Sequence, residues 1–292
     1  MSTQTEVQIS YDVSNEFFRL WLDRRKNYTC ALFEGTDDLE VAQERKLDWL
    51  HDAAGVTPDT RLLDIGCGWG ACLEYMTTVK GVRRAGGITL SPAQHAEVIA
   101  RELPGVEVAC VSYADFEPEQ PFDAVVCICM MEHICTPEEV RAGRHVAKYR
   151  DFFSRVWRWT TPGARFGLQT ILRDRVPRNP QDLADVAWVT TEIFPGGLSL
   201  RMEDVVRAVS PWWEITEVRT RRDHYRRTCA EWLSRLRAAE DEIRRRWGDR
   251  VFEDYDRYLS TCVRAFENHY QSLAQWSLTR VDSPLVPGGA RP

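Results

Sequence analysis

The chain has 292 residues, of which 43% are hydrophobic and 28% are charged, and this balance is typical of a folded globular protein. Its formal net charge of −6 argues against a nucleic-acid-binding groove. Nine cysteines are scattered without a C-x-x-C pair, so the sequence indicates neither a disulfide framework nor a metal site.

No stretch is apolar over the length needed to cross a bilayer, and residues 1–10 lack the apolar core of a signal peptide. We therefore expect a cytoplasmic protein without stable membrane insertion. The sequence leaves the oligomeric state unknown. Residues 283–292 are rich in proline and glycine and are expected to form a flexible tail.

The predicted elements begin with an N-terminal helical cap over residues 1–56, interrupted by a loop at 27–34. A core over residues 57–172 follows, in which apolar segments alternate with amphipathic ones. Repeated strand–helix units of this kind predict a parallel, doubly wound sheet. Its expected strands are 61–65, 84–89, 106–111, 122–129 and 165–171, and its expected helices are 69–79, a helix begun by Ser91-Pro92, and 145–160.

The second half of the chain departs from this alternation. Residues 173–212 carry several prolines and glycines, and we expect them to form a lid over the carboxyl edge of the sheet. Residues 213–282 complete the core. Their expected elements are a strand at 213–220, helices at 226–247 and 252–270, and a final strand at 274–280. The prediction is an α/β protein with seven strands.

The most informative motif directly follows the first predicted strand. It runs from Asp64 to Gly70 and has the pattern D-x-G-x-G-x-G. Glycines let the backbone approach a ligand closely. An acidic residue two positions before the first glycine is typical of S-adenosylmethionine (SAM) sites, whereas a dinucleotide site carries its carboxylate after the second strand. That strand ends at 86–91 without one, so SAM is the predicted cofactor, bound by Asp64, Gly66, Cys67 and Gly68.

Glu132 follows the apolar strand at 122–129, at the sheet edge where ligands bind. Burial there would raise its pKa, which suits a proton acceptor. The alternative is a carboxylate that caps the next helix. His133, its neighbour, is either a catalytic residue or a packing histidine.

Taken together, the ordered motifs resemble the cyclopropane-fatty-acid synthase and mycolic-acid cyclopropane synthase family of SAM-dependent methyltransferases. The resemblance covers nearly the whole chain and implies a Rossmann-like methyltransferase sheet. Plant benzylisoquinoline N-methyltransferases share much of the layout, so the acceptor atom stays open. The matching segments are 11–18, 28–34, 64–70, 87–91, Glu132-His133, 191–197, His224-Tyr225 and Arg227-Thr228.

The resemblance implies roles for cofactor-binding residues in three groups. Tyr28, Thr29 and the backbone at 66–68 would hold the methionine end of SAM. The ribose hydroxyls would be bound by Thr89 and Gln94, and the adenine would lie between Leu90 and Tyr113, where the family usually has tryptophan.

In the resembling family a bicarbonate ion stabilises the carbocation and removes its proton. The resemblance implies that backbone groups of Cys30 and Ile128, and side chains of Glu132 and Tyr225, would hold it. At the position of the family's histidine stands Gln169, which carries no titratable proton. Bicarbonate binding is therefore in question, and Glu132 is a candidate for direct base or cation stabiliser.

The stretch 135–148 is longer than its family counterpart and is expected beside the substrate entrance. Together with Gln169 and the changed residues before Thr191, it indicates a substrate other than an ordinary phospholipid acyl chain. We expect C-methylation of an alkene or electron-rich carbon of a small specialised metabolite, through a carbocation-like intermediate. Two other enzyme hypotheses remain: a cyclopropane synthase acting on acyl lipids or an acyl-like metabolite, and a small-molecule N-methyltransferase. A SAM-binding regulator without turnover is the alternative from a different class.

Overall fold

The computed structural model describes residues 13–284 of the chain. Most of the tail expected at 283–292 lies outside the described residues, as do residues 11 and 12 of the first motif. None of the helices in the described part is both long and apolar enough to cross a membrane.

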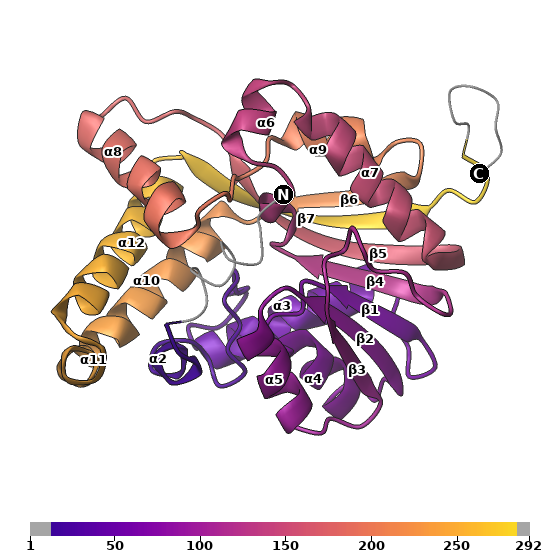
Figure 1. Ribbon diagram of the computed structural model, residues 1–292, viewed down its shortest axis with the longest axis horizontal. Helices are drawn as coiled ribbons and strands as arrows, with labels where there is room; N and C mark the ends of the chain where they lie inside the picture. The colour runs from indigo at the N-terminus through magenta and orange to yellow at the C-terminus, as the bar shows by residue number, and fades with distance from the viewer. Residues whose placement is uncertain (1–12, 285–292) are drawn as a thin grey trace.

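A seven-stranded sheet forms the centre of the protein, with strand order β3-β2-β1-β4-β5-β7-β6 (Figure 1). The first five strands pair in parallel, and the order reverses between β1 and β4. The predicted seven-stranded, doubly wound α/β sheet is thus confirmed. The strands are β1 Arg61–Ile65, β2 Arg84–Thr89, β3 Val106–Cys110, β4 Phe122–Ile128, β5 Thr160–Arg173, β6 Trp213–Thr220 and β7 Gln271–Arg280.

The parallel pairing predicted for the first five strands does not extend to β7, which is inserted between β5 and β6 and runs antiparallel to both. The reason lies in the helices that precede it. After β6 the chain forms α10 (Arg222–Ala238), α11 (Glu240–Trp247) and α12 (Asp249–Glu267), which lie together beside the sheet (Figure 1). These helices do not cross back over a sheet face, so the chain re-enters the sheet in the opposite direction.

The two long helices expected in this region differ from the observed ones. The first is broken at Ala239, where the backbone is not helical, so α10 and α11 are separate. The helix expected to begin at residue 252 instead begins at Asp249, directly after Gly248, whose φ of 92° is accessible mainly to glycine.

Helices cover both faces of the sheet, because alternate strand residues point to opposite sides. In β4, Ala124 and Val126 face one side, while Val125 and Cys127 face the other. The first face is covered by α3 (Leu39–Ala53), α4 (Ala71–Thr78) and α5 (Pro92–Ala100). The second is covered by α7 (His145–Arg158) and α9 (Met202–Val209), with the short α6 (Pro137–Arg141) nearby.

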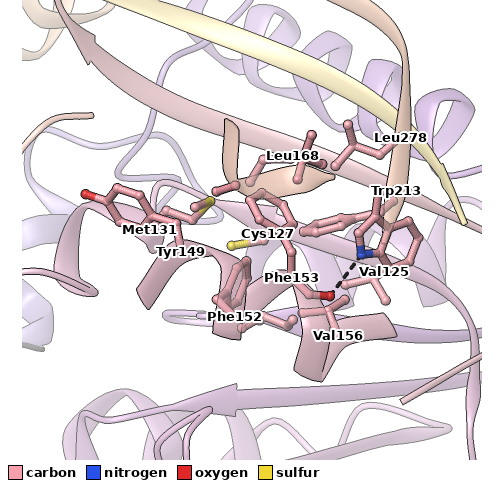
Figure 2. Packing of buried hydrophobic residues seen from close by; sticks show 14 of the residues in the cluster. Val125, Cys127, Met131, Tyr149, Phe152, Phe153, Val156, Leu168, Trp213 and Leu278 are labelled. Carbon is pink, nitrogen blue, oxygen red and sulfur yellow. Dashed lines mark hydrogen bonds between the residues drawn. The ribbon is translucent and has the colours of Figure 1, made fainter. Parts of the chain in front are cut away.

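Figure 2 shows the core on the α7 side of the sheet. Phe152, Phe153 and Val156 of α7 pack on the β4 side chains, and each is fully buried. The Trp213 indole N–H donates to the Phe153 carbonyl at 3.0 Å, so this ring buries no unpaired donor. Fully burying each of the Phe152, Phe153 and Val156 side chains contributes about 1.5–3 kcal/mol. This core fixes the strands whose carboxyl ends form the site.

A separate aromatic core joins the N-terminal helices to α10 and α12. Phe17 and Phe18 of α2 (Asn15–Arg19) pack with Trp21, Trp232 and Tyr255, all of them buried. Ser14 caps α2 and Asp38 caps α3 with side-chain hydrogen bonds to backbone N–H groups. This cluster holds the loop that follows α2 against the edge of the sheet.

Candidate active site

A cavity of about 250 Å³ lies at the carboxyl ends of β1, β2 and β4. Loop residues from the N-terminal cap line one side of it, and side chains from α10 and α12 line another. The structure brings fourteen of the sixteen predicted site residues to its wall: Tyr28, Thr29, Asp64, Gly66, Cys67, Gly68, Thr89, Leu90, Gln94, Tyr113, Ile128, Glu132, His133 and Tyr225.

The glycine-rich turn is shaped by backbone that only glycine adopts easily. Gly66 has a φ of 81°, and a Cβ there would lie 2.8 Å from the Met130 Cβ. Gly68 has a φ of 53°, and the nearest atom to an added Cβ is the Gln94 Nε2 at 3.8 Å. The N–H groups of Gly66 and Cys67 both donate to the Ile88 carbonyl at 3.0 Å. A rigid turn therefore borders open cavity space at Gly68.

Thr89 and Gln94 lie side by side at the same end of the cavity. The Thr89 hydroxyl donates to Gln94 Oε1 at 3.0 Å, and the Ser91 hydroxyl accepts from the Gln94 backbone N–H at 3.2 Å. The predicted helix start at Ser91-Pro92 is confirmed by this cap. Because the side-chain oxygen of Gln94 already accepts a hydrogen bond, its amide N–H groups are the part of the side chain left for a ligand. The amide nitrogen lies beside Gly68, where it can donate to the hydroxyl oxygens of a ligand.

Asp64 is the buried acid of the motif, with 1% of its surface exposed. Its Oδ1 has no hydrogen-bond partner among the described residues, and burial raises its pKa to about 7. An unpartnered buried carboxylate oxygen is costly unless a ligand donor meets it. The cationic amino group of the methionine end of SAM is such a donor, so Asp64 and the adjoining turn fit this cofactor.

Glu132 lies in a 3-10 turn at Met131–His133, directly after β4, and is 6% exposed. Its Oε1 accepts a hydrogen bond from the Ile171 backbone N–H in β5, while Oε2 has no partner among the described residues. Burial raises the pKa of Glu132 to about 7. A carboxylate anchored through one oxygen, with the other free at a cavity wall, is suited to accept a proton.

The interpretation of Glu132 as a helix cap is wrong. The next helix, α6, is capped by Thr136. The Thr136 hydroxyl accepts a hydrogen bond from the Glu139 backbone N–H, and the Glu139 carboxylate accepts one from the Thr136 backbone N–H. Glu132 instead joins β4 to β5, and its own carbonyl accepts from the Leu198 N–H at 2.8 Å.

Aromatic rings and thiols form the wall near Glu132. The Tyr225 ring of α10 stacks on Phe266 of α12 with centroids 4.5 Å apart. Tyr258 and Phe194 lie edge to face at 5.6 Å. Cys129, Cys229 and Cys262 complete this part of the wall. The helices that the chain interposes between β6 and β7 thus supply a largely apolar acceptor end.

Two predicted site residues, Cys30 and Gln169, are not among the wall residues of this cavity. Both are fully buried. The Gln169 amide oxygen accepts from Gln275 Nε2 at 3.0 Å, and its amide nitrogen donates to the Cys129 sulfur at 3.7 Å. The amide oxygen and one amide N–H of Gln169 are therefore engaged within the protein, and its side chain is not on the cavity wall. Gln169 does not take the place of an imidazole that holds bicarbonate at this wall.

The stretch 135–148, expected beside the substrate entrance, contributes no residue to the cavity wall. His145 at its end lies 3.2 Å from the Asp204 carboxylate in α9, and Lys148 pairs with Glu139. This stretch therefore packs against its own side of the sheet.

Sequence reasoning missed several wall residues. Lys46 and Asn27 come from the N-terminal cap, and Tyr258 comes from α12. None of these residues belongs to a recognisable sequence motif. For Lys46, the feature that could have indicated a role is its place as a lysine on an otherwise buried helix face. The sequence predicts Cys129 as the last residue of a strand, but β4 ends at Ile128 and the Cys129 φ of 54° is not that of a strand. Cys129 instead lines the cavity.

A doubly wound sheet with an antiparallel β7, an acid-preceded glycine turn and a carboxyl-edge cavity together define the class of SAM-dependent methyltransferases. Structural comparison agrees with this class. The cyclopropane synthase MmaA2 from Mycobacterium tuberculosis superposes with a TM-score of 0.87 at 29% identity, over 96% of this chain and 99% of that one. Mycolic acid cyclopropane synthase CmaA1 complexed with SAH and CTAB gives 0.86 at 28% identity, with the same coverage.

The chain belongs to the mycolic acid cyclopropane synthetase family, whose model matches residues 1–276. Among the curated relatives, cyclopropane mycolic acid synthase MmaA2 of Mycobacterium tuberculosis is 32% identical over 288 residues, which are 94% of this chain and 96% of the relative. The protein is accordingly an enzyme that uses S-adenosylmethionine as its cofactor.

Proposed function

We propose that this enzyme transfers the methyl group of SAM to an alkene or another electron-rich carbon of a small specialised metabolite, through a carbocation-like intermediate. The observation that carries the proposal is Glu132, a buried carboxylate whose Oε2 has no partner among the described residues and whose part of the wall is rich in aromatic rings and thiols. Such a wall suits an acceptor without strong hydrogen-bonding groups, and a single carboxylate suits a transient positive charge.

The roles of the side chains follow from what methyl transfer requires. When bound, SAM supplies an activated methyl group, so the protein needs no nucleophile and contributes mainly alignment. The Glu132 carboxylate stabilises positive charge on the acceptor, and its free Oε2 then takes the proton. The faces of Tyr225 and Phe266 add cation–π stabilisation.

The segment 173–212 is proposed as the lid of this site. Val189 and Thr190 of its π-helical turn (Val189–Ile193), which follows α8 (Pro180–Trp188), lie on the cavity wall, as does Phe194. We place the enzyme in the cytoplasm with a soluble substrate. Its net charge of −6 disfavours binding to nucleic acid and to an anionic membrane surface.

A cyclopropane synthase acting on acyl chains is the second candidate. The names of the relatives support it, and so does a smaller cavity of about 30 Å³ between α8 and α12. This cavity shares Val189, Thr190, Cys262 and Gln271 with the main one. Side-chain movement there would join the two spaces into a longer apolar channel.

The experiment uses SAM with a trideuterated methyl group and mass spectrometry of the products. The acceptor panel contains small alkenes, electron-rich aromatic compounds, amines and unsaturated acyl thioesters. A C-methyl product keeps all three deuterium atoms, whereas a cyclopropane keeps two because ring closure expels one. We expect fully retained label on a small alkene or aromatic carbon. Exclusive turnover of acyl chains, or label found only on nitrogen, would contradict the proposal.

A further inference from the structure

Lys46 of α3 is a buried cation on the wall of the cavity, with 1% of its surface exposed. Its ammonium donates to Asn27 Oδ1 at 2.7 Å and to Thr29 Oγ1 at 3.1 Å. No carboxylate of the described residues lies within 4.0 Å of it. Asp23 reaches it only through Asn27, whose two nitrogen atoms donate to the Asp23 carboxylate at 2.7 and 2.8 Å. A buried ammonium without an adjacent anion is costly.

The hydrogen bond to Thr29 fixes the direction of that hydroxyl. Because an ammonium can only donate, the Thr29 oxygen accepts from Lys46. Within residues 13–284, the Thr29 hydroxyl has no acceptor for its own proton. Since Thr29 lines the cavity, that proton is available to an acceptor there. Lys46 thus makes Thr29 a donor and places a positive charge behind it.

Asp64 provides the opposite charge on the same wall, with Oδ1 unpartnered. The methionine end of SAM carries one carboxylate and one amino group on the same carbon. Of the two lysines on the wall, Lys26 is paired with Glu97, so Lys46 is the one without an adjacent carboxylate. Of the two acids on the wall, Glu132 belongs to the acceptor end and Asp64 to the glycine turn. We propose that Lys46 is the counter-charge for the carboxylate of the methionine end, acting through the Thr29 hydroxyl, while Asp64 receives the amino group. This inference concerns the cofactor end and does not depend on the acceptor chemistry proposed above.

The test compares two ligands by calorimetry: S-adenosylhomocysteine and its decarboxylated form, which keeps the amine. Losing a hydrogen bond to a charged group costs about ten- to 150-fold in affinity. We therefore expect the wild-type protein to prefer S-adenosylhomocysteine by at least about tenfold. In Lys46→Met this preference should disappear, because S-adenosylhomocysteine loses affinity while the decarboxylated ligand does not.

Gln43 offers a matched control on the same helix face. Its side-chain amide donates to the carbonyls of Thr29 at 2.9 Å and Asn27 at 3.4 Å, so it holds the same loop without a charge. Gln43→Met should weaken both ligands equally and keep the preference. Lys46→Arg keeps the charge and should keep the preference as well.

Two results would overturn the inference. One is equal affinity of the wild-type protein for both ligands, which needs no variant to fold. The other is a folded Lys46→Met protein, checked by its thermal transition, that still prefers the carboxylate-bearing ligand. Either result leaves the proposed acceptor chemistry untouched, because neither measurement involves turnover.

Discussion

Glu132 is the residue whose charge state decides the proposed chemistry. One oxygen is held by the Ile171 N–H and the other is free, and burial raises its pKa to about 7. A base is active when deprotonated, so turnover should rise as the pH increases through about 7. This dependence belongs to the buried environment, since an exposed glutamate would be ionised throughout that range.

Glu132→Gln should reduce turnover at least about a hundredfold, because general-base catalysis is typically worth 10²–10⁴-fold. It should leave the affinity for S-adenosylhomocysteine nearly normal and remove the rise in rate near pH 7. Tyr225→Phe keeps the ring stacked on Phe266 and should cause a milder loss. Steady-state kinetics and calorimetry test both. A Glu132→Gln enzyme with normal turnover would place the base elsewhere.

At the cofactor end, Gln94 is expected to contribute one neutral hydrogen bond to the ribose. Gln94→Ala should therefore cost only about 0.5–1.5 kcal/mol of binding free energy, or at most roughly tenfold in affinity for S-adenosylhomocysteine. Titration calorimetry measures it. Since Thr89 donates to Gln94 in the free protein, the double variant should lose less than the sum of the two single losses. Complete loss of binding by a folded Gln94→Ala protein would contradict this role.

At the scale of elements, the antiparallel pairing of β5 with β7 determines what Gln169 can do. The register places Gln169 opposite Gln275, and the two amides hydrogen-bond across the strands. The Cys129 sulfur, just past β4, accepts a hydrogen bond from the Gln169 amide nitrogen. A side chain fixed between three segments in this way supports the sheet and is withdrawn from the cavity wall.

Turnover should therefore be insensitive to dissolved carbonate. Activity is measured in carbonate-depleted buffer, with and without added bicarbonate at constant pH and ionic strength. We expect the same rate in both, because the amide that replaces the family's imidazole is already engaged. A strong requirement for bicarbonate would show that Gln169 serves as a ligand after rearrangement.

At the scale of the whole molecule, the cavity reduces the stability of the protein without its cofactor. Burial raises the pKa of Asp64 from 3.8, and that of Glu132 from 4.5, to about 7. At pH values between the ordinary pKa of each acid and its pKa in the folded protein, the native state binds more protons than the unfolded chain. The free energy of unfolding must therefore fall as the pH rises through this window. The function of both acids is thus obtained at the expense of stability near neutral pH.

Glu132→Gln should relieve part of this cost. The stability gain is the free energy of unfolding of Glu132→Gln minus that of the wild type. This gain should be about 2–3 kcal/mol larger at pH 8 than at pH 5, since each pKa unit is worth 1.36 kcal/mol. Urea unfolding of the cofactor-free proteins at both pH values measures the difference. Glu138→Gln, at an exposed position of α6, is the control and should show no such change. An equal difference at both pH values would contradict the prediction.

The sequence alone determined the local features of this protein. The glycine turn with Asp64, the Ser91-Pro92 helix start and the positions of the strands follow from neighbouring residues, because backbone conformation, capping and apolar periodicity act over a few positions. The cofactor could be predicted for the same reason, since its binding motif is contiguous.

Only the tertiary structure decided which segments meet. The direction of β7, the break at Ala239, the engaged amide of Gln169 and the buried ammonium of Lys46 all depend on residues far apart in the chain. Burial and pairing set the charge and the availability of each polar group, and neither is a property of a residue and its sequence neighbours. For this reason the motif predicted the cofactor, while the fold determined that Glu132 presents a free carboxylate oxygen at the cavity wall.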